Sequence, residues 1–404
     1  MKVNVVGLGY IGLPTALSIA AGGIPVTGTD KKQEIVDTVR SGKMTFKEDG
    51  LDGLLERARN SGNLELSTSC VEADVYIVSV PTPYIKTTKK IDPAYVIGAV
   101  KDVLDVCRDG SILAVESTIS PGTMERFVRP LVKQSGKKLH IAHVPERIIP
   151  GNMLYELEHN SRTIGVDEKS VGETLMQVYS SFCKGQMVMT DVKTAEMTKV
   201  VENTFRDINI AFANELSRIC RRDGMDVYEV IRVANMHPRV NILTPGPGVG
   251  GHCISVDPWF LVGDYPDIVN IIKAAREVND GQPEFVLRRI AQVMQENGIQ
   301  SLSDVGLYGL TYKENVDDTR ESPTLQLLEY MKEHAAYGVK VYDPFARNGM
   351  TANQYDDFGK FLDDVKMVVI LVNHNQIKEN SSRLKGKIVL DTRNCVSDIP
   401  TYTL

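Results

Sequence analysis

The stretch that decides the fold is Val3-Asn4-Val5-Val6-Gly7-Leu8-Gly9-Tyr10-Ile11-Gly12. Its first four residues predict a short buried strand, and residues 14–21 have the apolar spacing of a helix. A GxGxxG turn between a strand and a helix is typical of a dinucleotide-binding site. Gly7 permits the tight turn, Gly9 lets a pyrophosphate approach the helix N-terminus, and Gly12 lets the helix lie close to the strand.

A second strand, predicted over residues 25–29, ends at Asp30. A carboxylate at this strand end binds the ribose hydroxyls and repels a 2′-phosphate, so we predict NAD rather than NADP. The alternative is a glycine turn in an unrelated α/β domain, because the motif alone also occurs by chance.

Length and composition limit the classes of protein that fit. A chain of 404 residues predicts two or three domains at roughly 150 residues each. The 46 Lys and Arg against 52 Asp and Glu give a net charge of −6, which argues against nucleic acid or an anionic membrane as partner. No apolar run is long enough for a membrane span, and no signal peptide is recognisable, so we expect a cytoplasmic protein. The 6 cysteines are scattered without a CxxC pair, so we expect no metal site.

Polar residues follow three further predicted strands, which cover residues 73–80, 111–115 and 139–144. These residues include Thr82, Thr118 and Glu146. Ligands of open parallel sheets bind beyond the carboxyl ends of the strands, so the three strand ends predict a lined crevice. Two alternatives stay open: the threonines cap helices, or Glu146 is only the ion-pair partner of Arg147.

Residues 193–222 have helical periodicity and contain no proline. Lys199, Asn203 and Arg206 fall on one stripe of this helix. Met197, Val200 and Val201 lie near one face, and Phe205, Ile208 and Phe212 continue this apolar side. The polar stripe is either a solvated face or part of a site.

A loop rich in glycine and proline precedes Cys253. Its bare backbone lets a ligand approach closely, and its N–H groups could stabilise an oxyanion. Cys253 is therefore a candidate nucleophile, whereas we interpret the other five cysteines as small buried residues. Together with a nicotinamide site, such a cysteine suggests oxidation of an aldehyde through a thiohemiacetal and a thioester. Alcohol to carboxylate is a four-electron change that needs two NAD.

The last hundred residues alternate strands and helices again. Lys313, Arg320 and Arg393 lie at or after strand ends and suit phosphate or carboxylate partners, although each alone could be surface charge. The glycines near Gly306 do not form a second GxGxxG, so we expect no second NAD there. The predicted fold class is α/β: an N-terminal Rossmann domain (1–190), a central helical domain with a long spine helix (191–298) and a C-terminal Rossmann-like α/β domain (299–404).

Taken together, the motifs resemble the UDP-glucose/GDP-mannose dehydrogenase family along essentially the whole chain. They are Gly7 to Pro14, Val80-Pro81-Thr82-Pro83, Glu116-Ser117-Thr118, Pro145-Glu146-Arg147, Lys199 to Asn203, the loop with Cys253, and Lys313 through Pro323. Residues 237–241 and 248–260 look most like members that act on UDP-N-acetyl-D-mannosamine. Val256 stands where UDP-glucose enzymes have a lysine, and Pro150 stands where they have a second glutamate.

The resemblance implies a role for each matching residue. Cys253 matches the nucleophile, and Lys199 matches the lysine that stabilises the oxyanion and takes part in proton transfer. Asn203 and Asp257 match residues that position a water and the lysine, Glu146 matches the base for thioester hydrolysis, and Thr118 lies by the nicotinamide. The residues matching nucleotide-sugar contacts are Lys199, Asn203, Arg147, Ile148, Arg206, Gly250, Lys313 and Arg393, with His237 and Arg239 lent across a dimer interface. The residues matching cofactor contacts are Gly7, Gly9, Tyr10, Ile11, Gly12, Asp30, Thr82, Thr118 and Arg320.

The resemblance therefore implies an NAD-dependent four-electron oxidation at C6 of a UDP-N-acetylhexosamine. The expected substrate is UDP-N-acetyl-D-mannosamine, and its uronic acid would be a precursor of surface polysaccharide. We also expect a homodimer with shared active sites, a central domain for dimerisation and catalysis, and a C-terminal domain for the UDP-sugar. The alternatives are UDP-N-acetylglucosamine or UDP-glucose as substrate, a two-electron hydroxyacid dehydrogenase, and a non-catalytic NAD-binding sensor.

Overall fold

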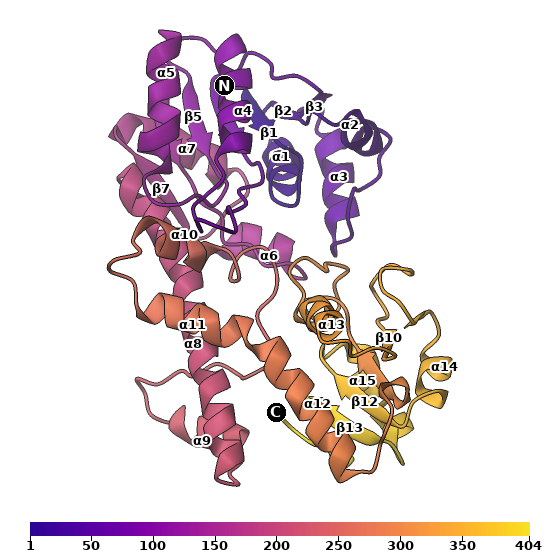
Figure 1. Cartoon of the computed structure of the whole chain (residues 1–404). Helices are drawn as coiled ribbons and strands as arrows, with labels where there is room; N and C mark the ends of the chain where they lie inside the picture. The colour runs from indigo at the N-terminus through magenta and orange to yellow at the C-terminus, as the bar shows by residue number, and fades with distance from the viewer. The chain divides into compact units, whose positions relative to one another are not determined.

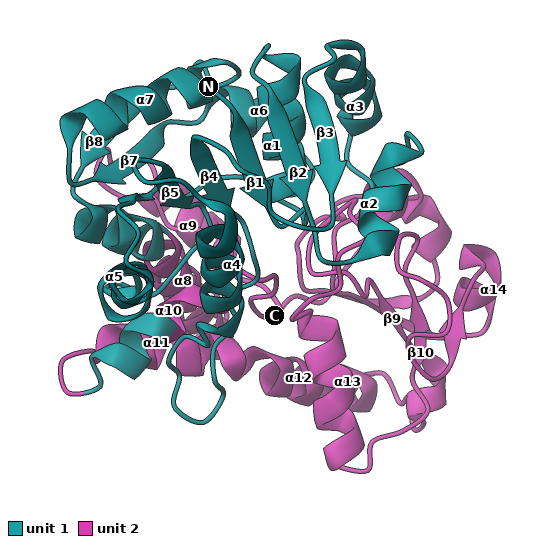
Figure 2. Cartoon of the chain, turned by 90° about the horizontal axis from the view of Figure 1, so that it is seen from above, with its two compact units in different colours: residues 1–202, 260–266 teal, residues 203–259, 267–404 magenta.

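The computed structural model describes residues 1–404 and divides into two compact units (Figure 2). The first comprises residues 1–202 and 260–266, and the second comprises residues 203–259 and 267–404. The helices α8 (Val192–Arg222) and α10 (Asp257–Asp264) each cross the boundary. The division into three domains that we expect from the sequence stays a prediction.

The first unit contains an eight-stranded sheet in the order β3-β2-β1-β4-β5-β6-β7-β8. All neighbouring strands pair in parallel except β6 and β7. The order of the first six strands is that of a dinucleotide-binding Rossmann sheet, so the predicted N-terminal fold is confirmed. The strands are β1 (Val3–Val6), β2 (Val26–Thr29), β3 (Leu64–Ser67), β4 (Val75–Val78), β5 (Ile112–Val115), β6 (His140–His143), β7 (Arg162–Val166) and β8 (Met187–Thr190).

Helices cover both faces of this sheet. Val3, Val5, Val75 and Ile77 alternate along their strands and share one core cluster with residues of α1, α3, α6 and α7. The helices α4 and α5 contribute nothing to that cluster and lie on the other side of the strands (Figure 2). The helices are α1 (Gly12–Ala21), α2 (Gln33–Arg40), α3 (Leu51–Asn60), α4 (Ala94–Val106), the π-helix η1 (Met124–Val128), α5 (Arg129–Ser135), α6 (Met153–His159) and α7 (Lys169–Ser180).

The second unit contains a five-stranded, all-parallel sheet in the order β11-β10-β9-β12-β13, drawn in orange and yellow in Figure 1. Residues of α12 and α13 share one core cluster with the strands, and residues of α14 and α15 share another. The predicted C-terminal Rossmann-like fold is therefore confirmed. The strands are β9 (Val305–Tyr308), β10 (Lys340–Tyr342), β11 (Gln354–Tyr355), β12 (Met367–Ile370) and β13 (Ile388–Asp391).

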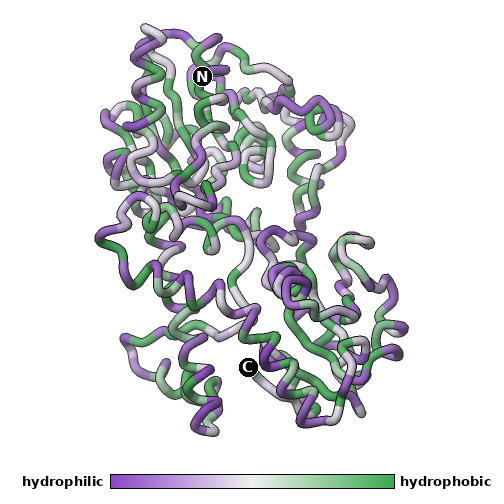
Figure 3. The backbone as a smooth tube through the Cα atoms, in the orientation of Figure 1, coloured by the Kyte–Doolittle hydropathy of each residue, from purple (hydrophilic) through white to green (hydrophobic).

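The remaining helices of the second unit precede or cover this sheet. They are α9 (Val227–Ala234), α11 (Ile271–Asp280), α12 (Gln282–Glu296), the 3-10 helix η2 (Leu302–Asp304), α13 (Pro323–Glu333), α14 (Phe358–Asp363), α15 (Asn375–Glu379) and the 3-10 helix η3 (Ser381–Leu384). The central strands of both sheets are mainly hydrophobic (Figure 3), because a parallel sheet covered on both faces buries successive side chains. None of the helices combines the length and the apolar composition needed to cross a bilayer.

Candidate functional site

The glycine turn between β1 and α1 has the geometry that the motif predicts. Gly7 has a φ of +96°, and a Cβ there would overlap the carbonyl oxygen of Ser79. A Cβ on Gly12 would overlap the carbonyl oxygen of Gly7, so the helix lies close to the strand. A Cβ on Gly9, by contrast, would meet no atom within 4 Å. The turn therefore leaves open space at the one glycine that we expect to face a pyrophosphate.

Asp30 lies against this turn. One oxygen of its carboxylate accepts a hydrogen bond of 2.9 Å from the backbone N–H of Leu8, and the other accepts one of 2.9 Å from Lys32. The side chain is only partly buried. Gly7, Gly9, Gly12 and Asp30 thus come together in the first unit, as a dinucleotide site requires.

Tyr10 and Ile11 extend the same turn. The Tyr10 ring stacks on Phe46 at 4.2 Å, and its hydroxyl donates to Glu48 at 3.3 Å. Ile11 packs against the core cluster of the first unit. Glu48 also accepts hydrogen bonds from the backbone N–H groups of Gly151 and Met153, so Tyr10 is tied to the segment that leads into α6.

The ends of β4 and β5 bring Thr82 and Thr118 together. The Thr82 hydroxyl donates to the carbonyl oxygen of Thr118 at 2.6 Å. Since the hydroxyl of Thr82 is bonded to a neighbouring strand end, and α4 begins after Pro93, the interpretation of Thr82 as a helix cap is wrong. Ser117 reinforces the junction, because its hydroxyl bonds both the N–H and the carbonyl of Val80 at 2.7 Å.

Glu146 follows β6, and its side chain is 6% exposed. Its carboxylate accepts a hydrogen bond from the backbone N–H of Ile148. Arg147 instead pairs with Glu202 of α8 through Nη2 at 2.6 Å and Nε at 2.8 Å. The alternative in which Glu146 is only the partner of Arg147 is therefore wrong. The Ile148 side chain is buried in the core, and the nucleotide-sugar contacts expected of Arg147 and Ile148 stay predictions.

The sequence reasoning did not single out Glu116, a buried carboxyl group directly after β5, as a site residue. Glu116 is fully buried and accepts hydrogen bonds from Arg162 at 3.0 Å, Thr15 at 3.2 Å and Tyr179 at 3.4 Å. Burial raises the pKa of Glu116 to about 7, although the charge of Arg162 opposes the rise. The available signal was a lone arginine opening the otherwise uncharged strand β7.

In the second unit, Asn203 and Asp257 form a buried pair. The Asn203 side-chain amide donates to Oδ2 of Asp257 at 2.5 Å, and Arg206 donates to the Asn203 side-chain oxygen. The exposed fractions of the Asn203 and Asp257 side chains are 0% and 2%. Along the same helix, Lys199 lies one turn before Asn203 and is 5% exposed. Lys199 and Asn203 are thus buried and Arg206 is partly buried, which excludes the interpretation of this stripe as a solvated face.

Cys253 lies beside this pair. Its backbone carbonyl accepts hydrogen bonds from the N–H groups of Val256 at 3.0 Å and Asp257 at 2.9 Å. The Cys253 side chain is partly exposed. Burial, with Asp102 adding to its effect, raises the pKa of Cys70 to about 11, and burial with Asp391 raises that of Cys395 to about 12, so both stay neutral thiols at pH 7. The remaining three cysteines are buried.

The glycines before Cys253 allow close packing against residues 312–323. A Cβ on Gly250 would lie 2.7 Å from both the Glu321 carbonyl oxygen and the Tyr312 Cβ. Gly251 has a φ of +82°, and its N–H donates to the Arg320 carbonyl at 3.0 Å. That N–H is therefore not available as an oxyanion donor, contrary to our expectation for the loop.

Three cations expected to bind ligands also belong to the second unit. Arg320 forms a bidentate pair with Asp318 at 2.9 and 2.6 Å. The Arg393 guanidinium lies against Gly246, where a Cβ would be 2.7 Å from Nη1. Lys313 lies on the segment that follows β9 and is partly buried. Gly250, Arg320 and the Cys253 loop are thus brought together, whereas the ligand contacts of Lys313 and Arg393 stay predictions.

An exposed apolar stripe runs along α8. Phe205, Phe212 and Ile219 recur at every seventh residue and are 64%, 49% and 53% exposed. Beyond α9, His237 and Arg239 lie in an exposed loop, where the N–H of Arg239 donates to His237 at 3.3 Å. These three side chains are therefore exposed, whereas Val200 on the predicted apolar side is fully buried.

A Rossmann sheet with this glycine turn, joined to a cysteine loop and a second parallel sheet, defines the class of nucleotide-sugar dehydrogenases, which are oxidoreductases. The chain belongs to the UDP-glucose/GDP-mannose dehydrogenase family. Residues 1–183 match its NAD binding domain, residues 193–281 its central domain and residues 306–398 its UDP binding domain.

Individual relatives cover almost the whole chain. The UDP-N-acetyl-D-mannosamine dehydrogenase of Methanococcus aeolicus is 43% identical over 98% of this chain and 92% of its own. The NDP-N-acetyl-D-galactosaminuronic acid dehydrogenase of Ralstonia nicotianae is 40% identical over 97% and 95%. Among solved structures, the UDP-D-ManNAc dehydrogenase of Pyrococcus horikoshii superposes with a TM-score of 0.92 at 34% identity, covering 100% of this chain and 99% of that one.

Proposed function

We propose that the protein oxidises the C6 alcohol of UDP-N-acetyl-D-mannosamine to the carboxylate. The observation that carries the proposal is the buried Asn203–Asp257 pair, whose aspartate is hydrogen-bonded through its backbone to Cys253. A buried amide–carboxylate pair beside a partly exposed thiol suits a covalent intermediate, because it holds polar groups next to a nucleophile in fixed orientation. The identity of 43% to a UDP-N-acetyl-D-mannosamine dehydrogenase supports this substrate.

The proposed reaction balances as one alcohol, one water and two NAD⁺ giving one carboxylate, two NADH and three protons. Bound NAD⁺ supplies the two-electron acceptor for each of the two oxidations. The Cys253 sulfur adds to the C6 aldehyde, with a proton going to the aldehyde oxygen, and the resulting thiohemiacetal is oxidised to a thioester. Water then attacks the thioester carbon, the carbon–sulfur bond breaks, and the sulfur regains a proton.

The other polar residues suit distinct steps of this sequence. Lys199, an ammonium 5% exposed, is placed to stabilise negative charge on the C6 oxygen, since a desolvated cation acts more strongly than an exposed one. Glu146, 6% exposed, is placed to accept a proton from the hydrolytic water. Asn203 and Asp257 orient the water and the lysine, and Thr82 and Thr118 border the nicotinamide end of the crevice.

The cofactor preference follows from Asp30. The open space at Gly9 suits a pyrophosphate, and the Asp30 carboxylate, held by the N–H of Leu8, suits two ribose hydroxyls. A 2′-phosphate at that position would face a negative charge, which favours NAD over NADP.

The nucleotide end of the substrate belongs to the second unit in this proposal. Lys313, Arg393, Arg206 and Gly250 hold the UDP-sugar, and the match of residues 306–398 to a UDP binding domain supports this assignment. The product, an N-acetylmannosaminuronic acid nucleotide, suits incorporation into surface polysaccharide. A cytoplasmic location stays a prediction.

We also propose a homodimer in which His237 and Arg239 reach the partner's site. The exposed stripe of Phe205, Phe212 and Ile219 supports it, because apolar residues repeated every seven positions along a helix favour packing against another helix.

A substrate panel with NADH counting tests the function. UDP-N-acetyl-D-mannosamine should release two NADH per sugar at the highest kcat/KM, above UDP-N-acetylglucosamine and UDP-glucose. A nucleotide-linked N-acetylgalactosamine sugar is the second candidate substrate, because the Ralstonia relative at 40% identity is named as an NDP-N-acetyl-D-galactosaminuronic acid dehydrogenase. One NADH per sugar would instead indicate a two-electron dehydrogenase, and NAD binding without turnover on any sugar would indicate a sensor.

A further inference from the structure

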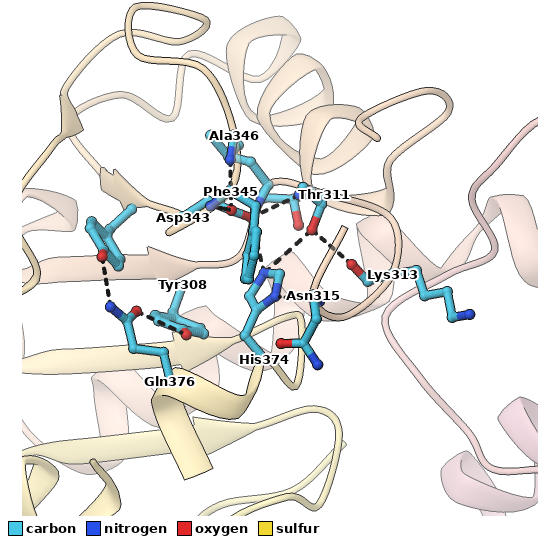
Figure 4. Close-up of polar contacts among 12 residues, drawn as sticks. Tyr308, Thr311, Lys313, Asn315, Asp343, Phe345, Ala346, His374 and Gln376 are labelled. Carbon is cyan, nitrogen blue, oxygen red and sulfur yellow. Dashed lines mark hydrogen bonds and ion pairs between the residues drawn. The ribbon is translucent and has the colours of Figure 1, made fainter. Parts of the chain in front are cut away.

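Three neighbouring strands of the second sheet end at one buried polar cluster (Figure 4). Asp343 follows β10, Thr311 follows β9, and His374 follows β12 at the N-cap of α15. The strand β9 lies between β10 and β12, so the chain departs in opposite directions from this point of the sheet. In open α/β sheets, such a switch point is where ligands bind.

The side chains of Asp343 and His374 are both completely buried, with exposed fractions of 0%. Oδ2 of Asp343 accepts hydrogen bonds from the N–H groups of Leu310 at 2.5 Å and Thr311 at 2.9 Å, and it lies 3.2 Å from Nε2 of His374. Oδ1 accepts from the N–H groups of Phe345 and Ala346. The carboxylate therefore fastens the end of β9 to the end of β10.

Asn315 determines the tautomer of His374. Its backbone N–H, which can only donate, lies 2.9 Å from Nδ1, so Nδ1 carries the lone pair and the proton sits on Nε2. That proton points toward Asp343 and Thr311. His374 thus links the carboxylate on one side to the backbone of Asn315 on the other.

The segment held in this way carries Lys313. The Thr311 hydroxyl donates to the Lys313 carbonyl at 2.9 Å, and Asn315, two residues later, has a φ of +57°. Lys313 is therefore held on both sides (Figure 4). Before it, the N–H of Thr311 donates to Asp343, and after it, the N–H of Asn315 donates to His374. The Lys313 side chain itself extends away from the buried cluster (Figure 4).

The same segment supports the cysteine loop. Tyr312, between Thr311 and Lys313, packs against Gly250 and Gly251, and its N–H donates to the Asp318 carbonyl at 3.0 Å. A shift of residues 311–315 would displace both the lysine and the surface on which the loop of Cys253 rests.

We propose that His374 is a positioning residue that, with Asp343, presets residues 311–315 so that Lys313 meets the UDP moiety of the substrate. The inference rests on the proposed function only in its assignment of UDP to Lys313. Without His374, Asn315 loses its acceptor and Asp343 loses its side-chain donor, so the segment samples other conformations before the nucleotide binds. Preorganisation of a binding segment is expressed as affinity.

The test compares variants that separate packing from hydrogen bonding. His374→Phe keeps a ring against Tyr308 and Phe345, which lie 5.8 and 5.0 Å away, but removes all three polar contacts of the imidazole. Thr311→Val keeps the His374 ring and removes the hydroxyl that holds the Lys313 carbonyl and lies 3.3 Å from Nε2 of His374. His334→Phe is the matched control, because this exposed histidine bonds only the carbonyl of Tyr330 in its own helix.

The Kd of UDP alone, measured by calorimetry on the full-length protein, is the first readout. It should rise about tenfold in His374→Phe and by a smaller factor in Thr311→Val, and stay at the parent value in His334→Phe. The double variant Lys313→Met, His374→Phe should have nearly the same Kd for UDP as Lys313→Met alone. With turnover, KM for the UDP-sugar should rise while KM for NAD is unchanged.

Parent Kd values in both Thr311→Val and a folded His374→Phe would overturn the inference. Independent, multiplicative effects of His374→Phe and Lys313→Met would also overturn it. If His374→Phe does not fold, Thr311→Val decides alone. UDP binding can be measured without turnover, so the two proposals can fail separately. A parent protein that binds UDP but oxidises no sugar would refute the proposed reaction. The same Kd values would still decide whether His374 is a positioning residue.

Discussion

Asn203 on α8 donates a 2.5 Å hydrogen bond to Asp257, the first residue of α10, and both side chains are almost completely buried. Arg206 donates a hydrogen bond to the side-chain oxygen of Asn203, so both ends of the Asn203 amide are bonded and its orientation is determined. A buried amide held in one orientation can position a water or a lysine without reorganising during the reaction.

Replacing Asp257 with Asn should therefore lower kcat by about two orders of magnitude, because the amide removes the buried negative charge although its oxygen can still accept from Asn203. Initial rates with saturating UDP-sugar measure the effect. Asp267→Asn, an exposed aspartate in the same unit, is the control and should keep the parent rate. A kcat within twofold of the parent in Asp257→Asn would refute the positioning role of this pair.

Cys253→Ser should abolish the second oxidation, since a serine hydroxyl is a far weaker nucleophile at neutral pH than a thiolate. We expect the rate of acid formation to fall by at least about a thousandfold. Quenched-flow counting of NADH and uronic acid measures it. Cys70→Ser, which replaces a thiol with a raised pKa, should change neither. Release of two NADH and acid at the parent rate by Cys253→Ser would rule out covalent catalysis.

Asp30→Asn should weaken discrimination against NADP by about tenfold, because the carboxylate charge is lost while one oxygen still accepts the N–H of Leu8. The ratio of kcat/KM for NAD and NADP measures this change. Asp37→Asn, on exposed α2, serves as the control. An unaltered ratio would remove Asp30 from the ribose site.

Ionisation of Glu116 should destabilise the first unit as the pH rises. Burial raises its pKa from 4.5 to about 7 in the folded state, so its contribution to stability is fully present below pH 4.5 and is lost as the pH rises through 7. The shift corresponds to at most about 3 kcal/mol. Buried His143, whose pKa burial lowers to about 3, acts in the opposite sense, so stability must be compared between variants.

The measurement is the free energy of unfolding at pH 5.5 and 8 for the parent and Glu116→Gln. The parent should lose more stability than the variant over this interval, because only in the parent does this buried group ionise as the pH rises. Glu65→Gln, an exposed glutamate, should follow the parent. Equal pH dependence in the parent and Glu116→Gln would show that Glu116 does not titrate in this range.

Phe212→Glu should weaken self-association, because it places a charge in the middle of the exposed stripe on α8. Sedimentation equilibrium over a range of concentrations measures the dimer dissociation constant, which we expect to rise by about a hundredfold or more. Val188→Glu, a comparably exposed position on β8, should not change it. A monomeric parent with full activity would exclude sharing of His237 and Arg239.

Much of the fold was predictable because its signals are local. Apolar side chains recur every two residues in a strand and every 3.6 in a helix, and this spacing can be read from residues close together in the chain. The sequence therefore predicted a helix over 193–222, which the structure has at 192–222. The glycine turn was equally legible, because its three glycines and Asp30 follow the spacing of one strand–turn–helix unit. Strand ends were less certain: the strand predicted over 73–80 is Val75–Val78, since Ser79 already packs against Gly7.

Pairings between distant residues were not predictable. The sequence alone left Arg147 as a possible partner of its neighbour Glu146, and only the packing of α8 joined it to Glu202. It supplied no reason to connect Asp343 with His374 or Glu116 with Arg162, because each pair meets only where separate strands end or run side by side.

The sequence by itself thus determined the two α/β units and the dinucleotide turn, and it made Cys253 the candidate nucleophile, since these depend on residue type and short spacing. Only the tertiary structure decided that Lys199 and Asn203 of α8 are buried while Phe205, Phe212 and Ile219 are exposed. The physical reason is that periodicity defines the two faces of a helix, whereas burial depends on which other elements, distant in the chain, cover each face.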